Sequence, residues 1–354
     1  MKRTMVENKQ PTSDALSLQD YFDRYLPSIE AEMQAIAKAS NPRHENFFGM
    51  MRYHLGWADA EFNPCEARSG KRVRPVLCLL SCEACGGDWE QALPAGAAIE
   101  IMHNFTLVHD DIEDRDETRR GRPTVWTLWG DAHAINVGDA MFALSNLSLL
   151  LLAERGVSAS IVVAACCLFN ITQLALTGGQ YLDIGFESRD DVLVEDYLVM
   201  VEGKTAALAA CSCEMGGLIA GASDEQCKHL REFGRNLGLT FQMCDDILGI
   251  WGDPARTGKP AGADIARRKK SLPILHGLER DQELRALLGQ EELSTSDVRR
   301  ATELLERAGS REYTHQLAQE HHAQALAALE EADLKGPARQ ALYELEMMLL
   351  NREV

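Results

Sequence analysis

Hydrophobic positions recur every three to four residues along nearly the whole chain, whereas the alternation typical of strands is scarce. This is the spacing of amphipathic and buried helices, so the sequence predicts an all-α fold. Such a number of long apolar helices predicts a bundle in which the helices pack around one another. The predicted helices cover residues 16–38, 45–57, 72–84, 95–113, 132–154, 158–181, 192–201, 205–220, 224–250, 270–279, 296–308, 311–332 and 337–351.

The chain has 354 residues, a length that would allow two or three domains. It contains no linker rich in Pro, Gly and Ser and no repeat of solenoid period, so we expect one domain over residues 15–354. Residues 1–14 are polar and are expected to be disordered, without the apolar stretch of a signal peptide. The uncharged run 157–181 contains polar residues and ends near a Gly-Gly pair, which favours a buried core helix over a membrane span.

The net charge of −18 argues against nucleic acid as a partner, because phosphate backbones require a basic face. It also argues against electrostatic docking to anionic lipid. Most of the ten cysteines lie inside apolar helical runs, where a free thiol behaves as a small hydrophobic group. Cys82 and Cys85 form a CxxC pair, but no His stands at zinc-finger spacing. These features favour free thiols and a cytoplasmic location.

Two acidic clusters follow apolar helical runs. The first contains Asp110, Asp111 and Asp114, and the second contains Asp245 and Asp246. A carboxylate that is desolvated at the end of a buried helix costs several kcal/mol unless it is neutralised. A hard divalent cation provides that neutralisation, and Mg²⁺ most often accompanies a phosphate substrate. A solvated acidic helix end is the structural alternative, which the apolar approach 105–109 makes less favourable.

Two basic segments complement the acidic clusters. Residues 119–124, with the sequence RRGRPT, follow the first cluster, and residues 70–75, with the sequence GKRVRP, open a predicted helix. Arginine side chains match phosphate oxygens in bidentate fashion. Several cations beside a helix N-terminus would form an anion site of diphosphate size. Alone, each segment is also typical of a solvated surface.

Taken together, these motifs resemble the trans-isoprenyl diphosphate synthases, also called the polyprenyl synthetase family. The resemblance runs from about residue 70 to residue 273. It implies the isoprenoid-synthase fold, a single-domain helical bundle around a central cavity. The matching stretches, in the order of the family, are residues 107–114 (LVHDDIED), 119–124, Gly179-Gln180 with Asp183, Lys204-Thr205, residues 241–248 (FQMCDDIL), Gly258-Lys259-Pro260, and Lys269 before residues 271–273.

The resemblance implies a Mg²⁺-dependent, head-to-tail condensation of isopentenyl diphosphate with dimethylallyl, geranyl or farnesyl diphosphate. Three Mg²⁺ ions are implied for each active site. Asp110 and Asp114 would bind two of them and Asp245 the third, with Asp111 and Asp246 in support.

The remaining implied residues contact the substrates. The allylic diphosphate would be held by Arg119, Lys204, Lys269 and Lys259, and isopentenyl diphosphate by Lys71, Arg74 and Arg120. Oxygens of Lys204, Thr205 and Gln242 would face the developing carbocation, and Gln180 joins the substrate-binding set. No dedicated protein base is required, because the proton can leave with the departing diphosphate. His109 is therefore expected to pack or to hydrogen-bond within its own helix.

Phe105 stands five residues before Asp110, about 7.5 Å deeper along a helix. Its ring either closes the floor of the tunnel that holds the growing product chain or is ordinary core packing. Met102, about one turn deeper, would be a second residue that limits the length of the product. In enzymes of the resembled family, an aromatic residue here without a two-residue insertion in the first motif accompanies a C20 product. We therefore expect geranylgeranyl diphosphate, with farnesyl or C25 products as the alternatives.

One residue departs from the resembled pattern, because Gly249 stands where the second motif usually has a third Asp. This leaves two other functions open: a class I terpene cyclase of the same fold, and a non-catalytic partner subunit. A purely structural bundle explains neither the acidic nor the basic motifs. The family commonly forms homodimers, and the apolar stretch 140–153 is a candidate interface or core segment.

Overall fold

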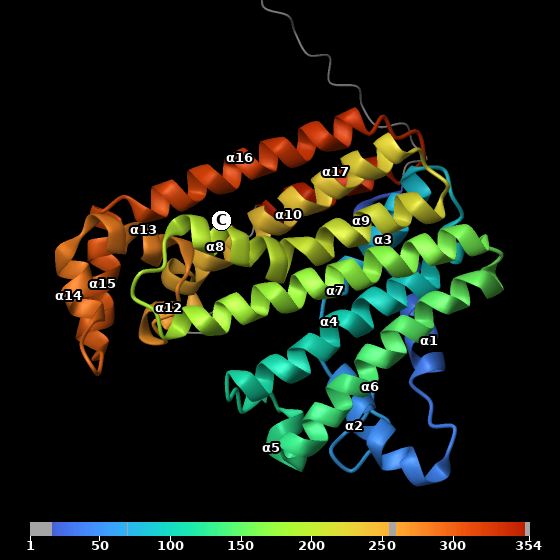
Figure 1. Cartoon of the computed structure of the whole chain (residues 1–354), viewed down its shortest axis with the longest axis horizontal. Coiled ribbons are helices and arrows are strands. Elements are labelled where there is room, and N and C mark those ends of the chain that lie inside the picture. Colours follow the sequence, from blue (N-terminus) through green and yellow to red (C-terminus); the bar gives the residue numbers. More distant parts are fainter. Residues whose placement is uncertain (1–15, 69, 255–259, 351–354) are drawn as a thin grey trace, which may run out of the picture.

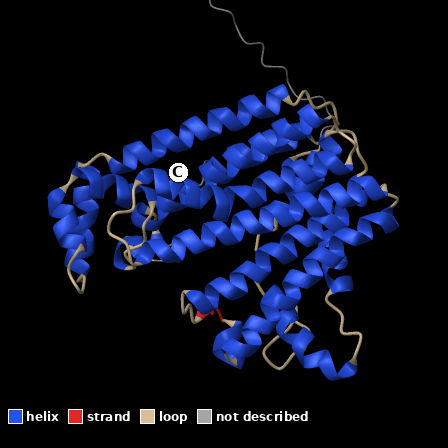
Figure 2. Ribbon diagram, in the orientation of Figure 1, coloured by secondary structure: helices blue, strands red, loops and turns tan. Residues whose placement is uncertain are grey.

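The computed structural model describes residues 16–68, 70–254 and 260–350, and these are almost entirely helical, as the sequence predicts (Figures 1 and 2). The main helices are α1 (Leu18–Ile36), α2 (Glu45–Leu55), α3 (Val73–Ala84), α4 (Leu93–Glu113), α6 (Asp131–Leu150), α7 (Ala159–Glu187), α9 (Ala207–Ile219), α10 (Asp224–Trp251), α15 (Thr295–Arg307), α16 (Ser310–Glu331) and α17 (Arg339–Leu350). The segment 1–14, for which disorder is predicted, lies outside the described residues.

Shorter elements connect these helices. They are the α-helices α5 (Val125–Trp129), α8 (Val194–Val201), α12 (Ala263–Ala266), α13 (Leu272–Arg280) and α14 (Gln282–Leu288), the 3₁₀ turns Pro42–His44, Trp89–Ala92 and Leu151–Arg155, and the π-helical turn Glu202–Ala206. Within the described residues the only strands are β1 (Thr118–Arg119) and β2 (Arg122–Pro123), which pair antiparallel beside the end of α4 (Figure 2). The helical periodicity did not predict this hairpin or the π turn.

The helix starts follow local capping chemistry. Ser223 caps α10, and its hydroxyl accepts from the backbone N–H of Gln226, whose side chain in turn accepts from the backbone N–H of Ser223. Ser158 caps α7 in a similar way through the N–H of Ile161. Both predicted starts agree with the structure to within one residue, because the capping signal lies within four residues of sequence.

The predicted end of α7 is wrong by six residues, since the helix continues to Glu187. The Gly-Gly pair that suggested an end is a packing contact instead. A Cβ built on Gly179 would lie 2.2 Å from the backbone nitrogen of Lys204, so only glycine lets the π turn approach α7 this closely. Gly179 therefore lets the backbone of Lys204, a residue of the candidate site, lie directly against α7.

The helices form one layered bundle in which α10 packs against α9 and α16, α4 packs against α6, and α3 packs against α9 (Figure 1). The main apolar core joins side chains of α1, α3, α4, α6, α7, α9 and α17. Each fully buried Leu or Phe in it contributes about 1.5–3 kcal/mol relative to an exposed one. This core is what holds α3, α4, α9 and α10 around the cavity described below.

Helices α6 and α7 expose apolar side chains on the outside of the bundle, among them Phe142, Leu147, Ile171, Leu174 and Tyr181. By length and composition alone, segments 131–155 and 159–187 could each cross a membrane. One face of each packs against the bundle, where Phe169 and Met141, for example, are fully buried. The predicted buried character of α7 therefore holds for one face, and the other face carries the exposed apolar residues.

Candidate active site

The first acidic cluster occupies the C-terminal turn of α4. Asp110 and Asp111 lie in this turn, and Asp114 is its C-cap residue. The carbonyl end of a helix is electrostatically negative, so three carboxylates there repel both the helix dipole and one another. Asp111 is 1% exposed; its Oδ1 accepts from Nε of Arg119 at 2.6 Å, while its Oδ2 has no hydrogen-bond partner. The β1–β2 hairpin folds Arg119 back onto the helix.

Burial makes the carboxyls of this cluster harder to ionise than ordinary Asp side chains. Burial raises the pKa of Asp110 to about 6; Lys204 opposes the shift and Asp114 adds to it. Burial likewise raises the pKa of Asp111 to about 6, although Arg119 opposes this shift. Burial also raises the pKa of Asp114. A divalent cation would stabilise the ionised forms, and this makes the carboxyl set a fit for a metal ion.

The π turn places Lys204 beside the first cluster. Lys204 pairs with Asp183 of α7, and its charge also acts on Asp110 and Asp114. Single π turns occur frequently at functional sites, because they redirect side chains out of the helical pattern. From α7, Gln180 donates to Glu113 at 2.7 Å. The structure thus brings Lys204 and Gln180, two of the residues singled out in the sequence, to the end of α4.

The second cluster lies on α10, and its buried member is fully hydrogen-bonded. Oδ2 of Asp246 accepts from the Tyr197 hydroxyl at 2.5 Å and from the Leu272 backbone nitrogen at 2.9 Å. Its Oδ1 accepts from Nε2 of Gln242 at 2.9 Å, and Oε1 of Gln242 accepts from the Thr205 hydroxyl at 2.9 Å. This chain of hydrogen bonds fixes two more predicted residues, Thr205 and Gln242, next to each other.

Lys269 connects the second cluster with α7. Burial lowers the pKa of Lys269, but four surrounding carboxylates outweigh this effect and raise it; they belong to Asp246, Asp264, Asp183 and Asp245. The lysine is therefore a charged group among acids of both α7 and α10. Lys259, the other lysine predicted in this region, lies outside the described residues.

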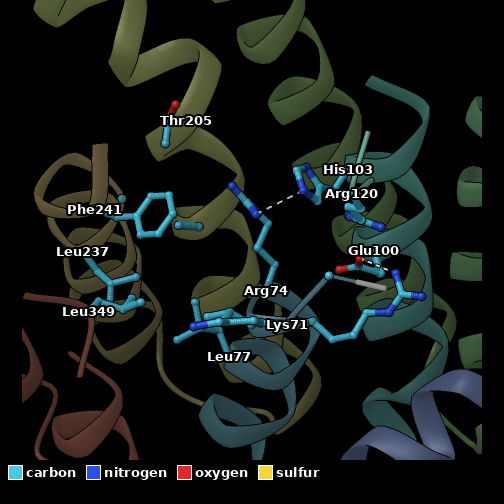
Figure 3. Close-up of a pocket in the computed structure, with 15 residues that line it drawn as sticks. Lys71, Arg74, Leu77, Glu100, His103, Arg120, Thr205, Leu237, Phe241 and Leu349 are labelled. Atoms are coloured by element: carbon cyan, nitrogen blue, oxygen red, sulfur yellow. Dashed lines mark hydrogen bonds and ion pairs between the residues drawn. The ribbon is translucent and has the colours of Figure 1, made fainter. Parts of the chain in front are cut away.

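A cavity of about 200 Å³ adjoins these clusters, and Figure 3 shows its two contrasting walls. Charged and polar groups, including Arg74, His103 and Arg120, form one wall, and an apolar wall faces them. The apolar wall includes Leu77 of α3, Leu237 and Phe241 of α10, and Leu349 of α17. The arrangement suits a ligand with a charged head and a hydrocarbon tail.

The cations of this cavity are held without a full set of partners. Nη1 of Arg74 lies 3.4 Å from Nε2 of His103, and Nε of Arg74 has no partner although it is buried. Burial lowers the pKa of Arg74, while Glu100 and Asp245 oppose the shift. Burial, Arg74 and Arg120 together hold the pKa of His103 well below its usual range. An anion bound between these groups would supply the partners that they lack; the roles of Lys71, Arg74 and Arg120 stay a prediction.

Arg72 shows that adjacent cations can have different roles. Its side chain is 2% exposed and binds Glu100 at 2.7 Å and Glu30 at 2.8 Å. Arg72 therefore links α1, α3 and α4. It lines the cavity together with Lys71 and Arg74, but its charge is already paired with two carboxylates.

Sequence reasoning missed three polar residues of the site: His103, Tyr197 and Asp264. His103 carried a usable signal, since it stands seven residues before Asp110 and lies on the same face of α4. Tyr197 and Asp264 carried none, because they reach the second cluster only through the packing of α8 and α12 on α10.

Phe105 is 5% exposed and packs edge-on against Phe142 of α6, with ring centroids 5.4 Å apart. It is not among the described residues that line the cavity in Figure 3. His109 also contacts α6: its Nε2 lies 3.4 Å from the carbonyl oxygen of Ile135, and the ring packs on Gly138. His109 also packs edge-on against Phe105 of its own helix, with ring centroids 6.0 Å apart, so the expected contact within α4 is present together with contacts to α6.

All ten cysteines are free thiols. Among the described residues, no three His, Cys, Asp or Glu side chains are arranged to hold a metal ion on their own. A cation at the acidic clusters can complete its coordination with substrate oxygens and water. Mg²⁺ commonly binds in this way, through one or two carboxylates together with substrate phosphates.

The fold and the site define a class of protein: an all-helical, single-domain protein with two carboxylate clusters and a cavity lined by cations that lack a full set of partners. The polyprenyl synthetase family model matches residues 60–305, and the chain belongs to this family. The predicted fold and the family resemblance are therefore confirmed.

Curated relatives of the chain are prenyltransferases, and so is this protein. It is 43% identical over 313 residues to a geranylgeranyl diphosphate synthase of Mycobacterium tuberculosis, covering 87% of this chain and 88% of the relative. It is 38% identical to a (2E,6E)-farnesyl diphosphate synthase of the same species, covering 97% and 96%. A polyprenyl synthetase structure from Streptomyces coelicolor A3(2) superposes with a TM-score of 0.87 at 36% identity, covering 94% of this chain and 100% of that one.

Proposed function

We propose that the protein condenses isopentenyl diphosphate with an allylic diphosphate and that its main product is geranylgeranyl diphosphate. The observation that carries the proposal is the second set of cations. Arg74 and Arg120 lie in the cavity, apart from Lys204 and Lys269, which face the carboxylate clusters. Two separate cation sets match two diphosphates, whereas a cyclase of the same fold needs only one.

The carboxylates suit Mg²⁺ because burial and mutual repulsion disfavour their charged forms until a cation binds. In this proposal Asp110, Asp114 and Asp245 hold three Mg²⁺ ions, with Asp111 and Asp246 in support. Bound Mg²⁺ would supply positive charge that stabilises the departing diphosphate.

The protein's own groups position the substrates. Arg119, Lys204 and Lys269, together with Lys259, hold the allylic diphosphate, and Lys71, Arg74 and Arg120 hold isopentenyl diphosphate. Thr205 and Gln242, joined by a 2.9 Å hydrogen bond, present oxygens to the developing positive charge. The apolar wall keeps water from that charge, and the proton leaves with the diphosphate, so no side chain acts as a dedicated base.

The direct test is an assay of purified protein with Mg²⁺, isopentenyl diphosphate and each allylic starter in turn. We expect a C20 product, and mainly C40 or longer chains would contradict the assignment of chain length. Geranylgeranyl diphosphate supplied alone provides the control, because conversion to a hydrocarbon would identify a cyclase. Inactivity of the isolated, folded protein would favour a partner subunit.

The C20 product is supported by the buried ring of Phe105 on α4, two turns before the end of the helix, and by its edge contact with Phe142. Phe105→Ala removes the proposed floor and should shift the product distribution toward C25 and longer chains. Phe105→Tyr, which keeps an aromatic ring, is the matched control. An unchanged product distribution in a folded Phe105→Ala variant would exclude the floor.

We further propose a homodimer and a cytoplasmic location. The exposed apolar side chains of α6 and α7, such as Leu174 at 74% exposure and Tyr181 at 76%, support a second copy as the occupant of this face. Light scattering after size-exclusion chromatography should give twice the mass of one chain. A monomer with unchanged activity would overturn the dimer.

A further inference from the structure

The β1–β2 hairpin carries two cations of the candidate site, and its register places a third arginine beside them. Arg119 stands opposite Arg122 across the two strands. The turn between them consists of Arg120 and Gly121. Arg119 reaches Asp111 of the first cluster, and Arg120 lines the cavity (Figure 3). Arg122 has no role in the proposed function, although it belongs to the same hairpin.

The turn of the hairpin holds Arg120 in a strained backbone conformation. Its φ is 55°, in the left-handed region, and Gly121 follows with a φ of 78°. Two positive φ angles are typical of a tight hairpin turn, but a residue with a Cβ adopts one only at a conformational cost. The Arg120 guanidinium packs against Gly70, where a Cβ would lie 2.9 Å from its Nη2. No described residue forms a hydrogen bond or an ion pair with this guanidinium, so its direction depends on the backbone of the turn.

Arg122 fixes the hairpin to the C-terminal end of α2. Nη1 of Arg122 donates to the carbonyl oxygen of Tyr53 at 3.0 Å, and Nη2 donates to that of Ala58 at 2.7 Å. The guanidinium carbon lies 3.9 Å from the centre of the Tyr53 ring. The Tyr53 hydroxyl in turn donates to the carbonyl oxygen of Pro123 at 2.8 Å. These contacts join the second strand of the hairpin to α2 and to the loop that follows it.

The anchor on α2 is itself held firmly. Tyr53 is 5% exposed, and its ring packs edge-on against Trp129 with centroids 5.1 Å apart. Phe62, from the loop after α2, stacks on Trp129 at 5.4 Å. The Tyr53 carbonyl lies in the last turn of α2, where the helix dipole favours a cation. A guanidinium suits this place because it can donate to two carbonyl oxygens and lie over a ring at the same time.

We propose that Arg122 is a positioning residue for diphosphate binding: by fixing the second strand to α2, it holds the strained turn that directs Arg120 into the cavity. The inference rests on the proposed function, in which Arg120 binds isopentenyl diphosphate. Arg122 itself is not among the described residues that line this cavity. It therefore acts through the backbone of its own hairpin.

The test measures binding of isopentenyl diphosphate by ³¹P nuclear magnetic resonance without added metal, so that the carboxylate clusters do not take part. Arg122→Ala should weaken binding about tenfold, because a hydrogen bond to a charged group is worth at least that factor and needs the correct geometry. Arg122→Lys keeps the charge but cannot make all the contacts with α2, so it should restore little of the affinity. If Arg122→Ala does not fold, Tyr53→Phe is the milder test, and it should weaken binding about twofold or more.

A double variant separates positioning from a general loss of stability. Arg120→Ala alone should weaken binding by about 10–100-fold. In that background Arg122→Ala should weaken binding by less than about twofold more, because the group that it positions is absent. The matched control is Arg285→Ala. Arg285 donates to the carbonyl oxygen of Leu278 near the end of α13 at 2.7 Å, so its loss removes a similar contact elsewhere and should leave the affinity unchanged.

Far-ultraviolet circular dichroism establishes that each variant is folded. Wild-type affinity in a folded Arg122→Ala, Arg122→Lys or Tyr53→Phe variant would overturn this inference alone. The same conclusion would follow if Arg122→Ala weakened binding by one and the same factor with and without Arg120. Absence of isopentenyl diphosphate binding by the wild-type protein would overturn the proposed function, and this inference with it.

Discussion

The two carboxylate clusters differ in how well the protein satisfies them. On α10, Asp246 accepts three hydrogen bonds from three different elements. On α4, Asp111 has one partner, Arg119, and an oxygen without any, and its neighbours sit at the negative end of a helix. The α10 cluster is thus built into the fold, whereas the α4 cluster is electrostatically unfavourable until something binds. We therefore expect the α10 side of the site to keep its geometry when a ligand binds, while the ionisation of the α4 carboxyls changes.

The largest expected effect comes from the α4 side. Asp110→Asn should lower kcat by about 10²–10³-fold, the range for loss of one preorganised electrostatic contact in a transition state. Asp245→Asn should lower kcat similarly. Glu117→Gln, at an exposed position just beyond the cluster, is the matched control and should retain activity. Near-normal kcat in a folded Asp110→Asn variant would mean that the first cluster does not carry the chemistry.

An intermediate effect should appear in the pH dependence of stability. The pKa values of Asp110 and Asp111, about 6 in the fold, exceed the ordinary Asp value of 3.8. The folded state therefore binds more protons than the unfolded state between these values, and without metal its stability should fall as pH rises through this window.

Mg²⁺ with pyrophosphate should reverse this trend, because the cation stabilises ionised carboxylates. The increase in melting temperature on adding both ligands should be larger at about pH 7 than at about pH 5. The Asp110→Asn variant should show a weaker dependence of this increase on pH. A ligand-induced increase that is the same at both pH values would indicate that these carboxyls do not bind the cation.

The smallest expected effect concerns the α10 side. Tyr197→Phe removes one of the three donors to Asp246 and should lower the free energy of unfolding by about 1.5–3 kcal/mol, the range for a hydrogen bond to a charged group. The two remaining donors should keep kcat within about tenfold of the wild type. Chemical denaturation and steady-state kinetics measure the two effects. A loss of kcat as large as that of Asp245→Asn would show that the cluster is less rigid than we infer.

The sequence predicted the helices well because helical periodicity and capping are local properties. The starts of α7 and α10, each marked by a capping Ser, agree with the structure to within one residue. The predicted end of α7 was wrong because the glycines that suggested it are required by a contact with another segment of the chain. The Gly178-Gly179 pair resembles a helix end, but Gly179 serves the close approach of the π turn, which no local pattern encodes.

The amino-acid sequence by itself determined the all-α class, the family, and the residue types of both clusters, since these depend on spacing within one segment. Only the tertiary structure decided which cations of the cavity are already paired: Arg72 is bound by Glu30 and Glu100, while Nε of Arg74 has no partner. It alone also placed Asp264 against Gly249. The physical reason is that the partner and the burial of a charge are set by other segments, which meet it only when the chain is folded.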